Sequence, residues 1–128
     1  MGKHAIGGGF SGPGGMTLPF PKAVRAGDLV FVAGRMATDA SARMIEGGIE
    51  ARTRQAMDNI EAILAEASCT MDDVVKCTCF IDDARDFARF NAVYASYFGD
   101  HPPARSTVRA QLVLDGKLEV EAIAYKPA

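Results

Sequence analysis

HPPARSTV, residues His101–Val108, is the stretch that does most to decide the fold. Its two prolines end any preceding helix and bias their neighbours toward extended backbone. The alternating, partly β-branched residues from Ala104 to Val113 then predict a strand. Arg105 would lie at the start of that strand, where its planar guanidinium offers a fixed set of donors to a carboxylate. A surface ion pair at a strand end is the simpler interpretation of the same position.

Two segments before this stretch carry the spacing of amphipathic helices. Apolar residues recur every three or four positions over residues 48–67, and charged residues mostly cover the opposite side. A second apolar stripe follows Asp82 or Asp83, either of which can cap a helix start. Gly99 ends this helix just before the prolines. Asn91 falls inside it, where asparagine has little helical propensity, so it either faces water or serves a site.

The strand pattern recurs in five segments: Lys22–Arg25, Leu29–Ala33, Val74–Ile81, about Arg105–Leu114 and Lys117–Tyr125. Thr70–Asp73 resembles a capping or turn element ahead of the third strand. Asp115-Gly116, between the last two strands, is a strong signal for a two-residue hairpin. The order strand, strand, helix, strand, helix, strand, strand predicts a two-layer α+β domain with both helices on one face of the sheet.

The start of the chain is rich in glycine and lacks periodicity. We therefore expect residues 1–16 to form a flexible arm ahead of a single domain over residues 17–128. Gly7–Gly12 fits the G-x-G-x-x-G pattern of dinucleotide-binding proteins, which is informative only between a strand and a helix. Too few residues precede it for a strand and no helical pattern follows, so no nucleotide cofactor is expected.

Composition and charge exclude several classes of protein. The chain has 128 residues, of which 48% are hydrophobic and 23% charged, as in an ordinary globular domain. A net charge of −2 without a block of lysine or arginine argues against nucleic-acid or membrane partners. No apolar run approaches the roughly 20 residues that span a bilayer. Three cysteines, an odd number, and no recognisable signal peptide predict a reducing, cytoplasmic location.

The cysteines are better explained as structural than as metal ligands. Cys77 and Cys79 would point to the same face of a strand, because side chains alternate. A lone Cys-x-Cys with both histidines far away in sequence is a weak zinc motif. Free cysteine is among the most buried residue types, so we expect buried thiols and no metal site.

Two features call for a second copy of the chain. Leu29–Ala33 is continuously apolar, which is typical of a strand covered on both faces, yet helices would cover only one. In the expected hairpin Glu119 faces Leu112, so Arg105 would lie on the order of 23 Å along the strand from it. One small ligand could then contact both groups only across a contact between copies, and the sequence predicts an oligomer.

The end of the apolar strand and the last strand hold further candidates. Gly34 ends the apolar strand, where backbone can approach a ligand or another chain closely. Arg35 follows as an ordinary strand-end charge or as a second cation near a site. Glu119 and Glu121 share a strand face, and two carboxylates in an apolar run need partners; Arg109 is one possibility.

Several blocks of the sequence, in order and at similar spacing, resemble the Rid (YjgF) family of imine and enamine deaminases. They are Ala26–Gly34, Gln55–Ile60, Asp72–Lys76, Phe90–Tyr94, Pro103–Val108 and Leu118–Ala124. The resemblance runs from about Pro19 to the C-terminus. It implies a chorismate mutase-like fold, with a mixed sheet and two helices on one face. It also implies a homotrimer whose sheets surround a central axis, with three clefts between neighbouring copies.

The resemblance implies an activity as well: hydrolysis of 2-imino acids, or their enamine tautomers, to 2-oxo acids and ammonia without metal or organic cofactor. Arg105 would hold the carboxylate of the substrate, and Glu119 would act on the attacking water as general base. Backbone groups near Gly34 and Thr107 would fix the imine end. Asn91 matches an asparagine near the family's substrate pocket.

This sequence departs from better-known members near the expected pocket. They commonly carry tyrosine where Phe20 stands, serine where Ala33 stands, and often cysteine where Thr107 stands. Arg35 replaces a glutamine and adds a charge. A more apolar and more cationic pocket favours a larger or doubly acidic enamine, similar to 2-aminomuconate, over 2-aminoacrylate.

Two other functions remain open alternatives. A trimeric protein that binds or senses 2-oxo acids or related small carboxylates without turnover would equally suit the loss of hydroxyl groups. A ribonuclease activity, attached to some family members, is disfavoured by the acidic balance and the absence of a basic stripe.

Overall fold

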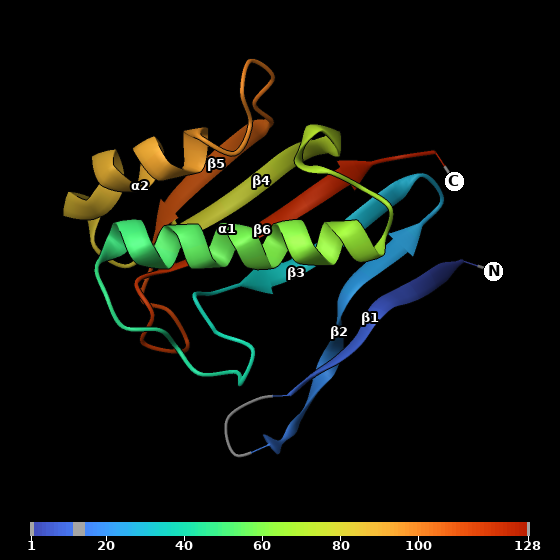
Figure 1. Cartoon of the computed structure of the whole chain (residues 1–128), viewed down its shortest axis with the longest axis horizontal. Helices are drawn as coiled ribbons and strands as arrows, with labels where there is room; N and C mark the ends of the chain where they lie inside the picture. The colour runs from blue at the N-terminus through green and yellow to red at the C-terminus, as the bar shows by residue number, and fades with distance from the viewer. Residues whose placement is uncertain (1, 12–14, 128) are drawn as a thin grey trace.

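The computed structural model describes residues 2–11 and 15–127. This part of the chain forms the following elements: β1 Lys3–Ser11, β2 Thr17–Ala26, β3 Leu29–Arg35, α1 Ile49–Glu66, η2 Met71–Asp73, β4 Val74–Ile81, η3 Ala84–Asp86, α2 Phe87–Ala95, β5 Ala104–Arg109 and β6 Leu118–Tyr125. The strands make one mixed sheet in the order β1-β2-β3-β6-β4-β5, in which only β4 and β5 are parallel neighbours. Both α-helices lie in front of this sheet in Figure 1, which confirms the predicted two-layer α+β arrangement.

Helix α1 forms where the periodicity predicts it. Its apolar stripe packs on the sheet and is buried: Ile49, Ala56, Met57, Ile60, Ile63 and Leu64. Burying each large aliphatic side chain contributes about 1.5–3 kcal/mol before entropy is counted, so this stripe supplies much of the core. None of the described helices is long and apolar enough to cross a membrane.

The segment after α1 also follows the prediction. Thr70 and Asp73 form a reciprocal capping box, in which the Thr70 backbone N–H donates to Asp73 Oδ2 at 2.8 Å. Strand β4 then has the bounds expected from the sequence. Cys77 and Cys79 are buried on its helix-covered face, and burial raises the pKa of both thiols, as expected of structural cysteines.

The predicted hairpin between the last two strands is wrong. β5 pairs with β4 in parallel, and β6 pairs antiparallel with both β3 and β4. Gly116 is a packing glycine, because a Cβ there would lie 2.6 Å from the terminal methyl groups of Met36 and Met44. The left-handed backbone belongs to Lys117 instead, at φ 73°. Long-range pairing with β4 on both sides has overridden the local turn signal.

The flexible arm expected over residues 1–16 is also wrong where the structure describes it. Lys3–Ser11 form β1, which pairs with β2 from Ala26 onward, so β2 is longer than the predicted Lys22–Arg25. In Figure 1 these two strands extend away from the helices as a ribbon. Gly7 and Gly8 adopt positive φ, and the register shifts beside them, which hides the strand periodicity. Gly12, the last residue of the G-x-G-x-x-G pattern, lies outside the described residues.

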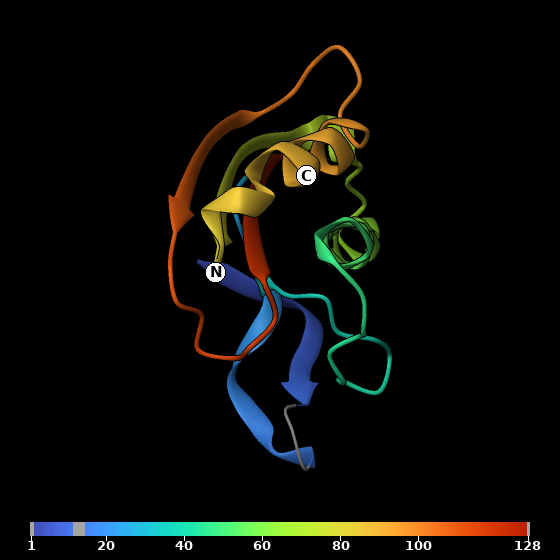
Figure 2. The ribbon, with the colours of Figure 1, turned by 90° about the vertical axis from the view of Figure 1, so that its left-hand side faces the viewer.

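The sheet face opposite the helices is bare and largely apolar. Val30 and Val32 of β3 are buried toward the helices, whereas Leu29 and Phe31 remain 36% and 39% exposed on the other side. Register adds further apolar residues to this open face: Val24, Phe80, Val108, Ile123 and Tyr125. In the turned view of Figure 2, α1 is seen end-on at one side of the strands, and no described helix lies at the other. The strand is therefore apolar on both faces, as predicted, and only one face is covered.

Candidate active site

Arg105 lies on the helix-covered face, at the edge of the sheet. It pairs in register with Cys77, whose side chain is buried toward the helices. The guanidinium carbon lies 4.8 Å from the ring centroid of Tyr94, 5.6 Å from that of Phe90 and 5.7 Å from that of Phe87. Among residues 2–11 and 15–127, none of the ion pairs involves Arg105. Its charge is therefore met by rings rather than by a carboxylate.

Two other predicted residues lie on the elements that flank Arg105. Asn91 belongs to α2, the helix of the three rings, and Thr107 follows two residues after Arg105 on the same strand face. Asn91 Oδ1 and Thr107 Oγ1 are buried without a hydrogen-bond partner in the described part of the chain. Such atoms are rare in native proteins, and a catalytic role is one of the explanations for them. We call Asn91, Arg105 and Thr107 the arginine half-site.

The other four predicted residues come together elsewhere. Phe20, Gly34, Arg35 and Glu119 all line a cavity of about 570 Å³ between β2, the end of β3 and α1. This volume lies within the range of small-molecule sites, roughly 300–1,000 Å³. We call these four residues the glutamate half-site. Sequence reasoning proposed each of them separately, and the structure brings them to one place.

A β-bulge arranges the glutamate half-site. Between Val32 and Arg35, β3 holds one residue more than the facing part of β6. Bulges of this kind re-aim side chains and occur often beside active sites. Gly34 lies against Glu119, and a Cβ on it would be 2.6 Å from Glu119 Oε2. Only glycine lets the carboxylate lie this close to the backbone, so the close approach expected at Gly34 is made by a side chain of the same chain.

The charged groups of the glutamate half-site, Glu119 and Arg35, are partly buried. Burial raises the pKa of Glu119, Glu121 on the same strand face raises it further, and Arg35 opposes both. Burial lowers the pKa of Arg35, the nearby Glu119 charge raises it, and the guanidinium stays protonated. A partly buried carboxyl with a raised pKa beside a cation has the properties of a general base.

A pair of amides that sequence reasoning missed holds the segment after Arg35. Asn59 Nδ2 donates to the carbonyl oxygens of Met36 and Thr38 at 3.0 and 2.9 Å. Gln55 Nε2 in turn donates to Asn59 Oδ1 at 2.9 Å, one helical turn away. The available signal was two amides spaced i, i+4 on the α1 face nearest the cavity.

Arg105 and Glu119 project from opposite faces of one sheet. Glu119 pairs in register with Phe80 on the open face, whereas Arg105 pairs with Cys77 on the helix-covered face, two strands away. The hairpin estimate of their separation is wrong because the hairpin does not exist. In the structure the two side chains instead project from opposite faces of the sheet, and a shared ligand between copies of the chain stays a prediction.

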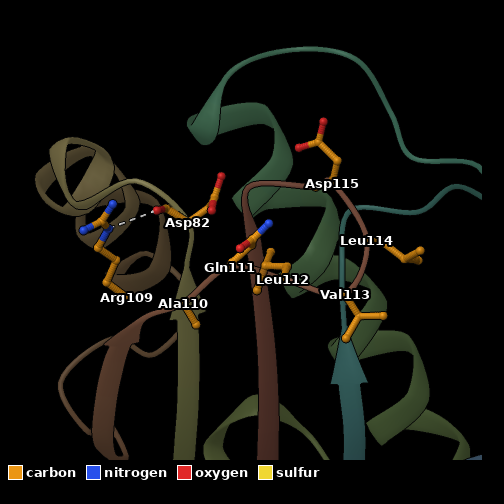
Figure 3. Close-up of a pocket in the computed structure, with 9 residues that line it drawn as sticks. Asp82, Arg109, Ala110, Gln111, Leu112, Val113, Leu114 and Asp115 are labelled. Atoms are coloured by element: carbon orange, nitrogen blue, oxygen red, sulfur yellow. Dashed lines mark hydrogen bonds between the residues drawn. The ribbon is translucent and has the colours of Figure 1, made fainter.

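A second cavity, also of about 570 Å³, lies beside the connection between β5 and β6. Figure 3 shows its lining: Asp82, Arg109 and residues 110–116. Arg109 Nε donates to the Asp82 carbonyl oxygen at 3.4 Å, so this arginine is not the partner of the β6 glutamates. None of the predicted site residues lines this cavity. No group of three histidine, cysteine or acidic side chains suited to a metal occurs among the described residues.

Comparison with known proteins identifies the family of this chain. Residues 15–126 match the family model described as Endoribonuclease L-PSP. A solved structure of the Rid family protein YyfA from Yersinia pestis superimposes with a TM-score of 0.86 at 31% identity, covering 96% of this chain and 98% of that one. The chain belongs to the Rid family. The family resemblance of the sequence is thus confirmed over nearly all of the chain.

Rid relatives with curated names are similar over most of their length. A RutC family protein from Pyrococcus horikoshii is 43% identical over 110 residues, which cover 84% of this chain and 87% of the relative. The 2-iminobutanoate/2-iminopropanoate deaminase of Salmonella typhimurium is 37% identical over 112 residues, covering 84% and 88%. Rid proteins therefore include one named as an imine deaminase, while the family model itself carries an endoribonuclease description.

Proposed function

We propose that this Rid protein hydrolyses 2-imino acids, or their enamine tautomers, to 2-oxo acids and ammonia. The observation that carries the proposal is the pair of half-sites. One offers an arginine with no carboxylate partner among the described residues, and the other offers a partly buried carboxyl with a raised pKa. A carboxylate-bearing substrate that is attacked by water needs both groups. The name of the Salmonella relative supports the same reaction class.

The half-sites meet, in this proposal, between neighbouring copies of a homotrimer. The bare apolar face of the sheet supports an assembly, because a patch of this kind normally marks an interface. Glu119 lies on that face, and Arg105 lies at the sheet's edge on β5. A neighbour that covers the open face can therefore bring its edge strand to the glutamate. Each cleft then takes Glu119 from one copy and Arg105 from the next.

The chemistry requires positioning and two proton transfers from the attacking water to the nitrogen. Arg105 binds the substrate carboxylate through paired hydrogen bonds. Glu119 accepts a proton from water as the oxygen attacks the imine carbon and passes it to the nitrogen, which gives a carbinolamine. It then carries the hydroxyl proton to the nitrogen as the carbon–nitrogen bond breaks and the carbonyl forms, so both protons of the water leave with ammonia. One imine and one water give one 2-oxo acid and one ammonia. Holding the reactants together supplies most of the acceleration, since imines also hydrolyse in free solution.

The cavity supports a substrate larger or more acidic than 2-aminoacrylate. Arg35 adds a second cation to its lining, and Phe20, which is 44% exposed, adds an apolar wall. The second carboxylate of a doubly acidic substrate, such as one similar to 2-aminomuconate, would bind Arg35. The relatives named above carry no such assignment, so we propose the substrate class and not that compound.

The direct test generates imino acids from amino acids with an amino-acid oxidase and follows ammonia release above the spontaneous rate. A series of substrates with one or two carboxylates defines the range. Arg105→Ala should lower kcat/KM by about 10²-fold or more, and Glu119→Gln by roughly 10²–10⁴-fold. Arg109→Ala is the matched control, because Arg109 lies on the same strand but outside both half-sites.

Three results would contradict the proposal. Calorimetric binding of 2-oxo acids with no acceleration of hydrolysis would identify a binding or sensor protein. Cleavage of single-stranded RNA with no effect on imines would favour the endoribonuclease description of the family model. Equal activity of the Arg105→Ala and Arg109→Ala variants would remove Arg105 from the reaction.

A further inference from the structure

Arg105 is surrounded by aromatic rings to an extent that the proposed reaction does not explain. Phe90 is fully buried, Tyr94 is 5% exposed, and Phe87 is 41% exposed at the outer end. Partly buried arginines usually pair with a carboxylate, yet none of the ion pairs of the described residues includes this one. Cation–π contacts with three rings take the place of that partner.

The rings themselves are held in place. Phe87, Phe90 and Tyr94 are spaced three and four residues apart, so they form one stripe along α2. The Tyr94 ring packs on Phe90 at 5.6 Å and on Phe98 at 4.9 Å between centroids. Ring contacts of this kind fix orientation as well as distance, which makes the stripe a rigid support.

Strand β4 also lies against Arg105 and the ring of Tyr94. The Tyr94 hydroxyl lies beside the Cys77 thiol, and Cys77 is the register partner of Arg105. Burial and this thiol raise the pKa of Tyr94, so the phenol stays neutral and adds no competing negative charge. Cys77 of β4 thus lies next to both the arginine strand and the ring helix.

We propose that Phe87, Phe90 and Tyr94 form an aromatic cage that positions the Arg105 guanidinium for an anionic ligand. A carboxylate partner would occupy the in-plane N–H donors and neutralise the charge. Ring faces attract the cation without accepting those donors, so the full charge and the planar fork stay available. The cage deepens the proposed function and rests on it only for the identity of the ligand. The three rings are positioning residues, since they act through Arg105.

The kinetic test distinguishes the cation–π contact of the Tyr94 ring from the contribution of that ring to packing. Tyr94→Leu removes a ring, and we expect it to raise KM for an imino acid about tenfold while kcat changes by less than about threefold. Tyr94→Phe keeps the ring and should stay near the parent protein. Phe98→Leu is the matched control, because it removes an equally buried ring that packs on Tyr94 but makes no cation–π contact with Arg105. Equal changes in KM for Tyr94→Leu and Phe98→Leu would overturn the cage.

A spectroscopic test does not depend on turnover. The Arg105 Nε–Hε resonance, assigned by its loss in Arg105→Ala, should be shifted upfield by the rings and should move downfield in Tyr94→Leu. Titration with pyruvate, a 2-oxo acid that undergoes no reaction here, should perturb this resonance in the parent protein and more weakly in Tyr94→Leu. If these shifts appear but no imine is hydrolysed, the proposed function fails and the cage stands. If Tyr94→Leu leaves the resonance and the pyruvate response unchanged, the cage is wrong.

Discussion

Gly34 and Glu119 are packed so closely that a methyl group on the glycine would lie 2.6 Å from the carboxylate oxygen. The contact joins the bulge at the end of β3 to the side chain proposed as the base. The Glu119 carboxylate is the end of a flexible side chain, so a methyl group on Gly34 would displace the carboxylate more than the backbone. Position 34 is therefore a place where catalysis and folding can be separated.

Gly34→Ala should lower kcat strongly and leave the fold intact. A displacement of about 1 Å at a reacting group costs on the order of 10²-fold in rate, whereas the glutamate side chain can move aside cheaply. Steady-state kinetics and thermal unfolding, measured together, check both parts. Gly48→Ala is the control, because a Cβ there meets its nearest neighbour, Glu50 Oε1, at an ordinary 3.9 Å. An unchanged kcat in Gly34→Ala would show that the position of Glu119 does not matter.

The pH dependence of kcat/KM should show an acid limb that belongs to Glu119. A general base must be ionised, so activity should fall as pH drops through its pKa, which burial holds above the ordinary value of glutamate. Arg35→Gln removes the charge that lowers this pKa, and the limb should move to higher pH. Glu121→Gln removes the charge that raises it, and the limb should move to lower pH. Shifts of the same sign in both variants would contradict this electrostatic assignment.

Charging the open sheet face should prevent assembly. Phe31 is 39% exposed in the single chain and lies in the middle of that face, so a glutamate there would be buried against a neighbour without a partner. We expect Phe31→Glu to give monomers by light scattering and to lose turnover. Ala65→Glu, on the exposed side of α1, is the control and should change neither property. A trimer of normal activity formed by Phe31→Glu would place the interface elsewhere.

Mixing two inactive variants should restore activity if each site draws on two copies. Arg105→Ala and Glu119→Gln, unfolded together in equal amounts and refolded, form mixed trimers. A site is intact when its arginine comes from a Glu119→Gln copy and its glutamate from an Arg105→Ala copy. Random mixing leaves about one quarter of the sites in this state. Refolding each variant alone supplies the baseline. Mixed samples no more active than this baseline would mean that Arg105 and Glu119 do not act in the same site.

The helices and β4 could be predicted because their own periodicity is strong. Residues such as Ile60 and Leu64 fall on one stripe whichever strands they pack on. β1 could not, because Gly7 and Gly8 erase the alternation that identifies a strand. The hairpin prediction was wrong because a turn signal is local, whereas the glycine at position 116 is required by close packing against Met36 and Met44.

The site residues were accessible to sequence reasoning, but their grouping was not. The chemistry of Arg105 and Glu119 and their positions in the family pattern predict a role in a site, and the structure divides them between two faces of the sheet. Phe90 and Tyr94 could be assigned only to an apolar stripe. Their place on Arg105 depends on β5 lying parallel to β4, which no pattern within β5 reveals. The expected cytoplasmic location stays a prediction.

The long connection over residues 110–117 has a consequence for how such a protein can diversify. Arg105 and Glu119 are each anchored to β4, so a longer or shorter connection between them would move neither. A tight hairpin would have coupled its own length to the spacing of the two groups. Leu114, within this connection, also lines the cavity that holds Glu119. Insertions and deletions here can therefore reshape the wall that a substrate meets while the reacting groups stay where they are.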